Sequence, residues 1–268
     1  MSAADPSGTG HQTGPENGTG HGTGDENGGR VRAGVWATLG DARTTLALRR
    51  AGFAWVGVDA QHGHFDDAAV RGLFALRHEP SAPVLVRVAA NDPVLIGRAL
   101  DAGADGVVVP LVQDAEQAGA AVAAAHYPPR GVRSWGPLPG SRDPAGGVAD
   151  APRPLCAVMV ETASAVADVR SIAGVPDLDM VFVGPFDLAL ALGRDVDELL
   201  ADTVEDAPLP VIVRACREAG ILAGAYAGSP ERAAALRAQG FSWIAVTTDT
   251  GVLQLGAEAA RTLSARSS

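Results

Sequence analysis

Residues 51–63 read AGFAWVGVDAQHG. The triplet at 51–53 is typical of a helix that ends on a glycine cap, and the apolar run at 54–60 has the length of a buried strand. Polar residues, first Asp59 and then His62, stand where that strand ends. A helix end, a buried strand and a polar strand end in this order predict one unit of a parallel sheet wrapped by helices.

The same unit recurs along the chain, with glycine-capped endings again at 102–104, 219–221 and 239–241. Short apolar runs, which are the expected strands, lie at 34–39, 54–60, 84–88, 105–110, 155–161, 180–184, 221–226 and 243–248. Expected helices lie near 41–51, 66–77, 92–102, 114–125, 163–172, 209–219, 229–239 and 251–264, with N-caps that include Asp41, Asn91 and Ser229. Eight such units predict an α/β fold, a closed (β/α)8 TIM barrel that occupies residues 31–268.

Residues 1–30 have a different composition. They hold nine Gly and no Val, Ile, Leu or aromatic residue, so they cannot bury enough apolar surface to offset the entropy of ordering. The segment GTGHQTGPEN at 8–17 recurs as GTGHGTGDEN at 18–27, which repeats one histidine as His11 and His21. We interpret residues 1–30 as a disordered, solvated low-complexity tail in preference to a metal-binding segment.

The composition disfavours several classes of partner. A formal net charge of -10 and a pI near 5.0 oppose binding to nucleic acids and anionic membranes, because both repel an acidic surface. No apolar run approaches the roughly 20 residues of a membrane-spanning helix, and the first thirty residues lack the apolar stretch of a signal peptide, so we expect a cytoplasmic protein. The contexts of Cys156 and Cys216 favour two buried thiols over a disulfide.

The chain contains no lysine, because all 21 basic residues are Arg. Schiff-base catalysis needs a lysine amine, so a lysine-dependent aldolase and a pyridoxal phosphate (PLP) enzyme are excluded. Neither a G-x-G-x-x-G segment after the first strand nor a P-loop occurs, so no nucleotide cofactor is expected. Activation of a substrate must come from a metal ion or from acid–base chemistry.

Two carboxylates are the candidate metal ligands. In a TIM barrel the active site forms at the C-terminal strand ends, where Glu161 ends the fifth apolar run and Asp187 follows the sixth. Each can give one oxygen to Mg²⁺ or Mn²⁺ and leave positions open for water and substrate. The spacing alone leaves an alternative equally open, in which both are helix N-caps or ion-pair partners.

Arg87 and His62 are the candidate catalytic side chains. An arginine inside a valine-rich strand must face an anion, which is either a substrate carboxylate or enolate oxygen, or alternatively Asp59 or Glu161 in a buried ion pair. His62 lies just beyond a strand end in a polar loop, where an imidazole suits proton transfer. Asp101 stands at the end of the third expected helix, where the helix dipole disfavours an acid, and such an acid can orient a histidine.

Eight segments, read in order, resemble the HpcH/HpaI aldolase family over about residues 31–264. They are GVWATL (34–39), AGFAWVGVDAQHG (51–63), VRV (86–88), LDAG (100–103), VPLVQ (109–113), YPPRGVR (127–133), VET (160–162) and FVGPFDL (182–188). The resemblance implies a metal-dependent class II pyruvate aldolase on a TIM barrel. Such an enzyme is a carbon–carbon lyase that cleaves or forms a 4-hydroxy-2-oxo acid to or from pyruvate and an aldehyde.

The resemblance also implies roles for individual residues. Glu161 and Asp187 would bind Mg²⁺, Mn²⁺ or Co²⁺, and Arg87 would stabilise the pyruvate enolate. His62, paired with Asp101, would handle protons. Trp36 would line the pocket, and backbone amides near Gly184, Pro185, Phe186 and Asp187 would hold the pyruvate carboxylate.

The residues leave the reaction partly open. The runner-up activity is decarboxylation of oxaloacetate or a related enolate-forming reaction, which needs the same metal and Arg87. A barrel that only binds a ligand is disfavoured, because the charged strand ends are retained. Two departures from the family put the second substrate in question. Met159 stands where an amide residue is frequent, and the Pro- and Gly-rich link from Arg133 to Leu155 is shorter than usual.

The last expected helix, at 251–264, carries the assembly prediction. Members of the family resemble one another in packing this helix against a neighbouring subunit. Here it holds Val252, Leu253, Leu255, Ala259 and Leu263 among small residues, so a monomer would bury these side chains only in part. We expect a homo-oligomer, either a trimer or a hexamer.

Overall fold

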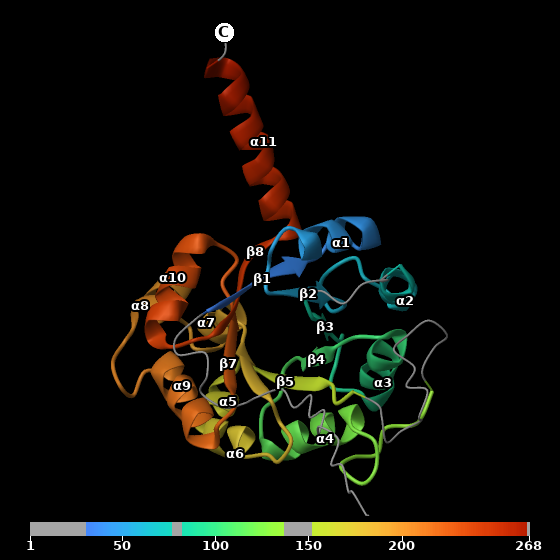
Figure 1. Cartoon of the computed structure of the whole chain (residues 1–268). Coiled ribbons are helices and arrows are strands. Elements are labelled where there is room, and N and C mark those ends of the chain that lie inside the picture. Colours follow the sequence, from blue (N-terminus) through green and yellow to red (C-terminus); the bar gives the residue numbers. More distant parts are fainter. Residues whose placement is uncertain (1–30, 77–81, 137–151, 267–268) are drawn as a thin grey trace, which may run out of the picture.

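The structure, a computed structural model that describes residues 31–76, 82–136 and 152–266, is built on a closed barrel of eight parallel strands (Figure 1). The strands are β1 Arg32–Ala37, β2 Trp55–Asp59, β3 Val84–Arg87, β4 Gly106–Val109, β5 Leu155–Val160, β6 Met180–Val183, β7 Leu222–Tyr226 and β8 Trp243–Thr248. The helices are α1 Ala42–Arg50, α2 Asp67–Ala75, α3 Pro93–Ala102, α4 Ala115–Ala125, α5 Ala163–Ala167, α6 Val169–Ala173, α7 Pro185–Ala191, α8 Val196–Ala201, α9 Pro208–Ala219, α10 Pro230–Gln239 and α11 Asp249–Arg266. The predicted TIM barrel is confirmed, and residues 1–30, with the predicted tail, lie outside the described residues.

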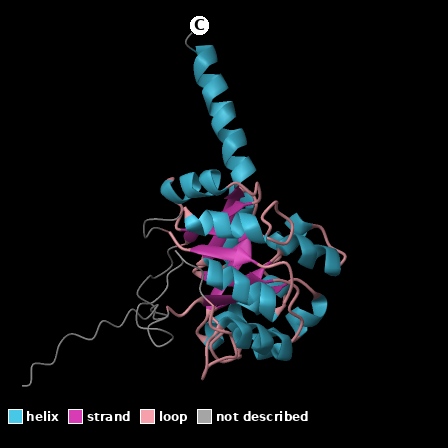
Figure 2. Ribbon diagram, turned by 90° about the vertical axis from the view of Figure 1, so that its right-hand side faces the viewer, coloured by secondary structure: helices cyan, strands magenta, loops and turns pink. Residues whose placement is uncertain are grey.

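The core has two layers. One layer of side chains lies between the strands and the helices, which surround the strands in Figure 2, and the other layer fills the barrel interior. The interior is unusually aromatic: Trp36 stacks on Phe182 at 5.6 Å between ring centroids and meets Trp55 edge-on at 6.3 Å. The indole of Trp36 needs a glycine on the neighbouring strand, because a Cβ added at Gly57 would overlap its ring. Gly57 of β2 therefore makes room for the indole that forms the floor of the barrel mouth.

The helix predictions hold with three corrections. Helices α7 and α8 were not predicted, because each has only two turns or fewer and so shows no clear helical period. The expected helix at 163–172 is divided into α5 and α6 at Asp168. Asp92, and not Asn91, is the N-cap of α3, because its carboxylate accepts from two backbone N–H groups of the first turn. The glycine caps at Gly103, Gly220 and Gly240 adopt the left-handed conformation, as predicted.

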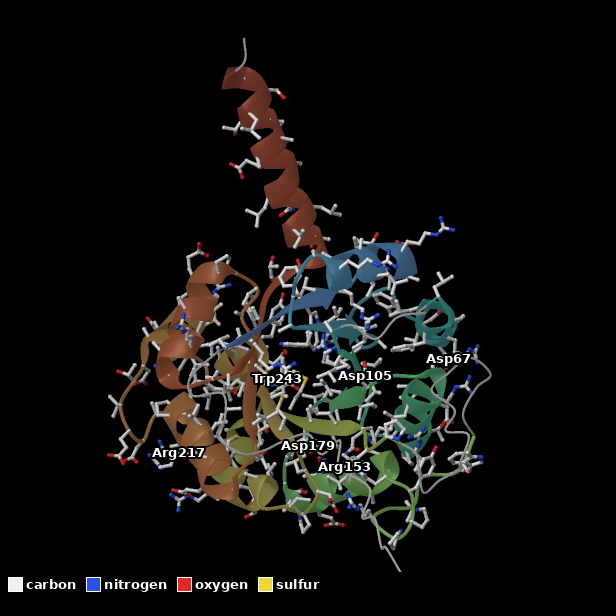
Figure 3. All side chains as sticks on the ribbon, viewed as in Figure 1. Asp67, Asp105, Arg153, Asp179, Arg217 and Trp243 are labelled. Atoms are coloured by element: carbon white, nitrogen blue, oxygen red, sulfur yellow. The ribbon has the colours of Figure 1, made fainter. Side chains whose placement is uncertain are left out.

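The N-terminal end of the barrel is closed by structural ion pairs. Asp179 accepts a hydrogen bond from the backbone N–H of Cys156 and pairs with Arg153, which lies beside it in Figure 3. Helices in a (β/α)8 barrel run antiparallel to the strands, so helix C-termini come to this same end. Asp101, in the last turn of α3, is therefore placed here, at the end opposite to the strand C-termini.

Helix α11 projects away from the barrel instead of covering it (Figures 1 and 2). Its first residue, Asp249, is buried and accepts hydrogen bonds from the backbone N–H groups of Thr38 and Leu39, which fixes the root of the helix to the end of β1. Residues 253–265 are exposed. In the part of the chain that the structure describes, no helix has both the length and the apolarity to cross a membrane.

Candidate active site

A buried carboxylate, Asp59, organises the C-terminal end of the barrel. It lies at the end of β2 with 2% exposure and receives hydrogen bonds from Arg87 Nε (3.0 Å) and Nη2, and from Trp36 Nε1 (3.2 Å). The backbone N–H groups of Gln61 and His62 donate to its Oδ1. Burial alone would raise the pKa of Asp59, but the hydrogen bonds and charge of Arg87 outweigh it and hold the pKa below its ordinary value.

Arg87 makes the buried ion pair that the sequence offered as an alternative to a substrate anion. The bonds to Asp59 use Nε and Nη2 of the guanidinium. Its Cζ also lies 5.4 Å from the centroid of the Trp36 ring. The bonds described for Arg87 leave the Nη1 edge for a further acceptor, so the ion pair orients the guanidinium without using all its donors.

Glu161 and Asp187 meet at the ends of two neighbouring strands. Glu161, which follows β5, is 3% exposed and packs against Gly184, where a Cβ would overlap its carboxylate. Its Oε2 accepts from the backbone N–H of Leu111 at 3.0 Å. Asp187, in the first turn of α7, lies close enough to share a hydrogen bond with the Glu161 carboxyl.

Glu161 carries a raised pKa of about 7. Burial is the largest cause, and the charge of Asp187 adds to it, while the Leu111 N–H and the charge of Arg87 act in the opposite direction. The exposed carboxylate of Asp187 therefore repels the buried carboxylate of Glu161. A divalent cation is the partner that would relieve this repulsion.

Within the described part of the chain, Glu161 and Asp187 are neither the helix N-caps nor the ion-pair partners that the sequence offered as an alternative. Thr162, not Glu161, is the N-cap of α5, and its hydroxyl accepts from the N–H of Ala165. Gly184 holds the N-cap position of α7. Within residues 31–76, 82–136 and 152–266, no salt bridge joins either carboxylate to a basic side chain.

The donor set fits a metal that needs few protein ligands. No cluster of three or more His, Cys, Asp and Glu side chains suited to a metal occurs among the described residues. The pair Glu161 and Asp187 thus offers two carboxylates. Magnesium is commonly held by one or two carboxylates together with water and substrate oxygens, so two ligands agree with such a cation and disagree with a closed structural zinc site.

His62 and Asp101 are not brought together within one chain. His62 is exposed in the loop after β2, at the C-terminal end of the barrel. Asp101 lies at the opposite end and accepts a hydrogen bond from Arg133 Nη2 at 2.7 Å. The expected pairing came from the family resemblance. A resemblance in sequence assigns a role to Asp101 but does not show at which end of the barrel this residue lies.

The expected carboxylate-binding segment needs one refinement. Pro185 has no backbone N–H, so only Phe186 and Asp187 can offer first-turn donors next to Gly184. Trp36 is 3% exposed and belongs to the barrel interior, where it forms the floor beneath Arg87.

Three contributors escaped the sequence reasoning. Leu111 donates its backbone N–H to Glu161 and has a φ of 56°, in the left-handed region. No sequence motif predicts this conformation for a leucine. Tyr226 ends β7 and contacts Trp36 at 5.8 Å between ring centroids. Its place as a polar aromatic residue at a strand end was the available signal. Asp59 was considered only as a partner for Arg87, whereas it also fixes Trp36 and the His62 loop.

A closed parallel barrel whose strand ends gather carboxylates, a guanidinium and an imidazole is the architecture of a TIM-barrel enzyme. The family model described as HpcH/HpaI aldolase/citrate lyase matches residues 32–254. The chain therefore belongs to the HpcH/HpaI aldolase/citrate lyase family, as its sequence predicted. Membership assigns it to the lyases that make or break carbon–carbon bonds.

Individual relatives agree with this assignment. A 2-dehydro-3,6-dideoxy-6-sulfogluconate aldolase of Pseudomonas putida is 35% identical over 236 residues, which cover 82% of this chain and 87% of that protein. A hydroxypyruvate/pyruvate aldolase of Agrobacterium fabrum is 38% identical over 202 residues, which cover 72% and 76%. The crystal structure of a family member from Burkholderia cenocepacia J2315 superposes with a TM-score of 0.77 at 30% identity and covers 88% of this chain and 95% of that one.

The raised pKa of Glu161 predicts how the metal-free protein responds to pH. A carboxyl whose pKa is about 7 when folded and 4.5 as the reference binds its proton more tightly in the folded state. Its contribution to stability is therefore lost as the pH rises from about 4.5 to about 7. With a chelator present, Glu161→Gln should be more stable than the unaltered protein at pH 8, by about 1–3 kcal/mol, and nearly equal at pH 5.

Urea unfolding at the two pH values measures this difference, with Glu218→Gln, an exposed glutamate on α9, as the matched control. Adding Mn²⁺ at pH 8 should stabilise the unaltered protein but not Glu161→Gln. Two results would contradict the assignment of Glu161 as a buried metal ligand. One is equal stabilisation of the unaltered protein and Glu161→Gln by Mn²⁺, and the other is a Glu161→Gln variant that is less stable than the unaltered protein at pH 8.

Proposed function

We propose that this protein is a divalent-metal-dependent aldolase that joins or separates pyruvate, or a close 2-oxo acid, and an aldehyde. The observation that carries the proposal is the pair formed by the buried carboxylate of Glu161 and the exposed carboxylate of Asp187, which has no basic partner among the described residues and lies beside Arg87. Glu161 and Asp187 would hold Mg²⁺, Mn²⁺ or Co²⁺. When bound, the cation supplies Lewis-acid polarisation of the 2-oxo acid.

The side chains divide the work. Arg87, held rigid by Asp59, offers its remaining guanidinium edge to the oxygen that becomes negative in the pyruvate enolate. The backbone N–H groups of Phe186 and Asp187 bind the pyruvate carboxylate. His62, at the mouth, removes or returns the proton of the pyruvate methyl group.

The named relatives support pyruvate as one substrate. The Agrobacterium fabrum relative is described as acting on hydroxypyruvate and pyruvate, and the Pseudomonas putida relative as cleaving a 2-dehydro sugar acid. Oxaloacetate decarboxylation is the weaker candidate, because neither description names it, although it needs the same carboxylates and Arg87.

The separation of His62 from Asp101 bears on assembly. Because the two residues lie at opposite ends of one barrel, the pairing implied by the family is open only to Asp101 of a second copy. Helix α11 supplies a surface for such an assembly, since Leu253, Leu255 and Leu263 are 57%, 56% and 65% exposed. We propose a trimer or hexamer in which α11 packs against a neighbouring copy, in the cytoplasm.

Proton transfer and metal dependence can be separated by experiment. A chelator should abolish both aldol cleavage and oxaloacetate decarboxylation, and Mn²⁺ should restore them. His62→Ala should exchange the methyl protons of pyruvate with deuterated water more slowly, by roughly 10²- to 10⁴-fold, as for a lost general base. Decarboxylation should survive better in this variant, because loss of CO₂ forms the enolate without a base.

The measurement is proton exchange by NMR beside a decarboxylation assay on the same preparation, with His64→Ala as the control. His64 is likewise exposed and lies two residues further along the loop. Unchanged exchange in His62→Ala would remove this histidine from the mechanism. Full turnover of the metal-free protein would overturn the proposed function.

The assembly is tested by light scattering of the full chain at micromolar concentration. We expect a trimer or hexamer, and we expect the double change Leu253→Glu with Leu263→Glu to yield smaller species with an unaltered far-ultraviolet spectrum. Val204→Glu introduces one such charge at an exposed apolar residue outside α3 and α11, and it should leave the assembly intact. A monodisperse monomer of the unaltered chain would contradict the proposal.

A further inference from the structure

A path of aromatic side chains leads from Arg87 towards the surface. The Trp36 ring lies under the Arg87 guanidinium, and Tyr226 of β7 contacts that ring at 5.8 Å between centroids. Phe186, the residue before Asp187, contacts Tyr226 at 5.9 Å and is 41% exposed. One wall of the mouth is thus formed by three rings from β1, β7 and α7.

A second guanidinium, that of Arg232, lies at the outer end of this path. Its Cζ is 4.9 Å from the centroid of the Phe186 ring. Arg232 belongs to the first turn of α10, and its Nε and Nη2 donate to Asp197 of α8 at 2.7 and 3.2 Å. Its side chain is 29% exposed, so the guanidinium is held in place but remains within reach of a ligand.

Tyr226 connects the two guanidinium groups. Burial raises the pKa of its hydroxyl, and the charges of Arg87 and Arg232 both act to lower it. Its ring contacts both Trp36, which lies under Arg87, and Phe186, which lies under Arg232. The mouth therefore presents one buried guanidinium at its base and another at its rim, with a phenol between the two.

The ion pair of Arg232 with Asp197 does not by itself account for this arrangement. The Asp197 side chain is 66% exposed, and ion pairs as exposed as this one contribute little to stability. An incoming anion can therefore take the place of Asp197 at little cost, while the contact with Phe186 keeps the guanidinium in position.

The net charge of the chain is unfavourable for anionic substrates, and a local cation offsets this effect. A net charge of -10 disfavours the approach of anions to the surface in general. The 2-oxo acid is matched by Arg87 at the base of the mouth. Arg232 lies at the outer end of the aromatic path, so its guanidinium is placed for the end of the second substrate that points away from Arg87.

We propose that Arg232, stacked on Phe186 beside Tyr226, is a specificity-determining residue that binds an anionic terminal group of the aldehyde. The aldehydes selected in this way carry a carboxylate or phosphate at the end away from the carbonyl carbon. The inference rests on the proposed aldolase function, and it names the class of the second substrate.

The test compares matched aldehydes in the pyruvate aldol reaction with Mn²⁺. Succinic semialdehyde is set against butanal, and glyceraldehyde 3-phosphate against glyceraldehyde. The unaltered protein should prefer the charged member of at least one pair. Arg232→Gln should lower kcat/KM for that charged aldehyde by roughly 10- to 100-fold, mainly through KM, as expected for the loss of a charge-assisted hydrogen bond. The loss with the uncharged member should be a few-fold at most.

Arg194→Gln is the matched control, because Arg194 makes a similar ion pair with Asp202 near the end of α7. Arg194→Gln removes the same charge, but Arg194 has no described contact with the aromatic path. This variant should therefore leave the preference for the charged aldehyde unchanged in both aldehyde pairs. Equal losses with both members of a pair, no loss with either, or no charge preference in the unaltered protein would overturn the inference and leave the aldolase function standing, since product still forms. The absence of aldol product from all four aldehydes would overturn the proposed function, and the inference with it.

Discussion

The candidate site depends on the buried carboxylate of Asp59. It binds the guanidinium of Arg87, the indole N–H of Trp36 and two backbone N–H groups of the loop that carries His62. An unpaired guanidinium in a barrel interior would cost several kcal/mol, so Arg87 keeps its position because Asp59 neutralises it. One carboxylate thus aligns the proposed enolate-binding group, the floor of the mouth and the start of the proton-transfer loop.

The same end of the barrel holds a second group of charged residues, in which the negative charges are not neutralised. Arg87 and Asp59 form a satisfied pair, whereas Glu161 and Asp187 are two acids without a basic partner among the described residues, and the pKa of Glu161 rises to about 7. This difference in charge separates the ion pair of Arg87 and Asp59, which positions a side chain, from the proposed cation site at Glu161 and Asp187. Gly184 and the N–H of Leu111 hold Glu161 in this unfavourable arrangement, which the surrounding fold must sustain.

Sequence reasoning recovered the barrel because each strand is a short apolar run and several helices end on a glycine such as Gly103. It missed α7 and α8, which are too short to show a period. Glu161 and Asp187 were predictable as neighbours, since consecutive parallel strands end at the same edge. The contacts of Phe186 with Tyr226 and Arg232 were not, because they depend on how α7 meets β7 and α10, which come much later in the chain. The expected pairing of His62 with Asp101 fails within one chain, because helices run antiparallel to the strands.

The central claim is that Glu161 and Asp187 hold a divalent cation beside Arg87, with the 2-oxo acid between them. The most direct measurement is a crystal structure of the protein with Mn²⁺ and pyruvate, in which anomalous scattering locates the manganese. The account predicts manganese bonded to carboxylate oxygens of both Glu161 and Asp187, with a pyruvate oxygen facing the guanidinium of Arg87. Manganese bound elsewhere, or pyruvate bound away from Arg87, would contradict it.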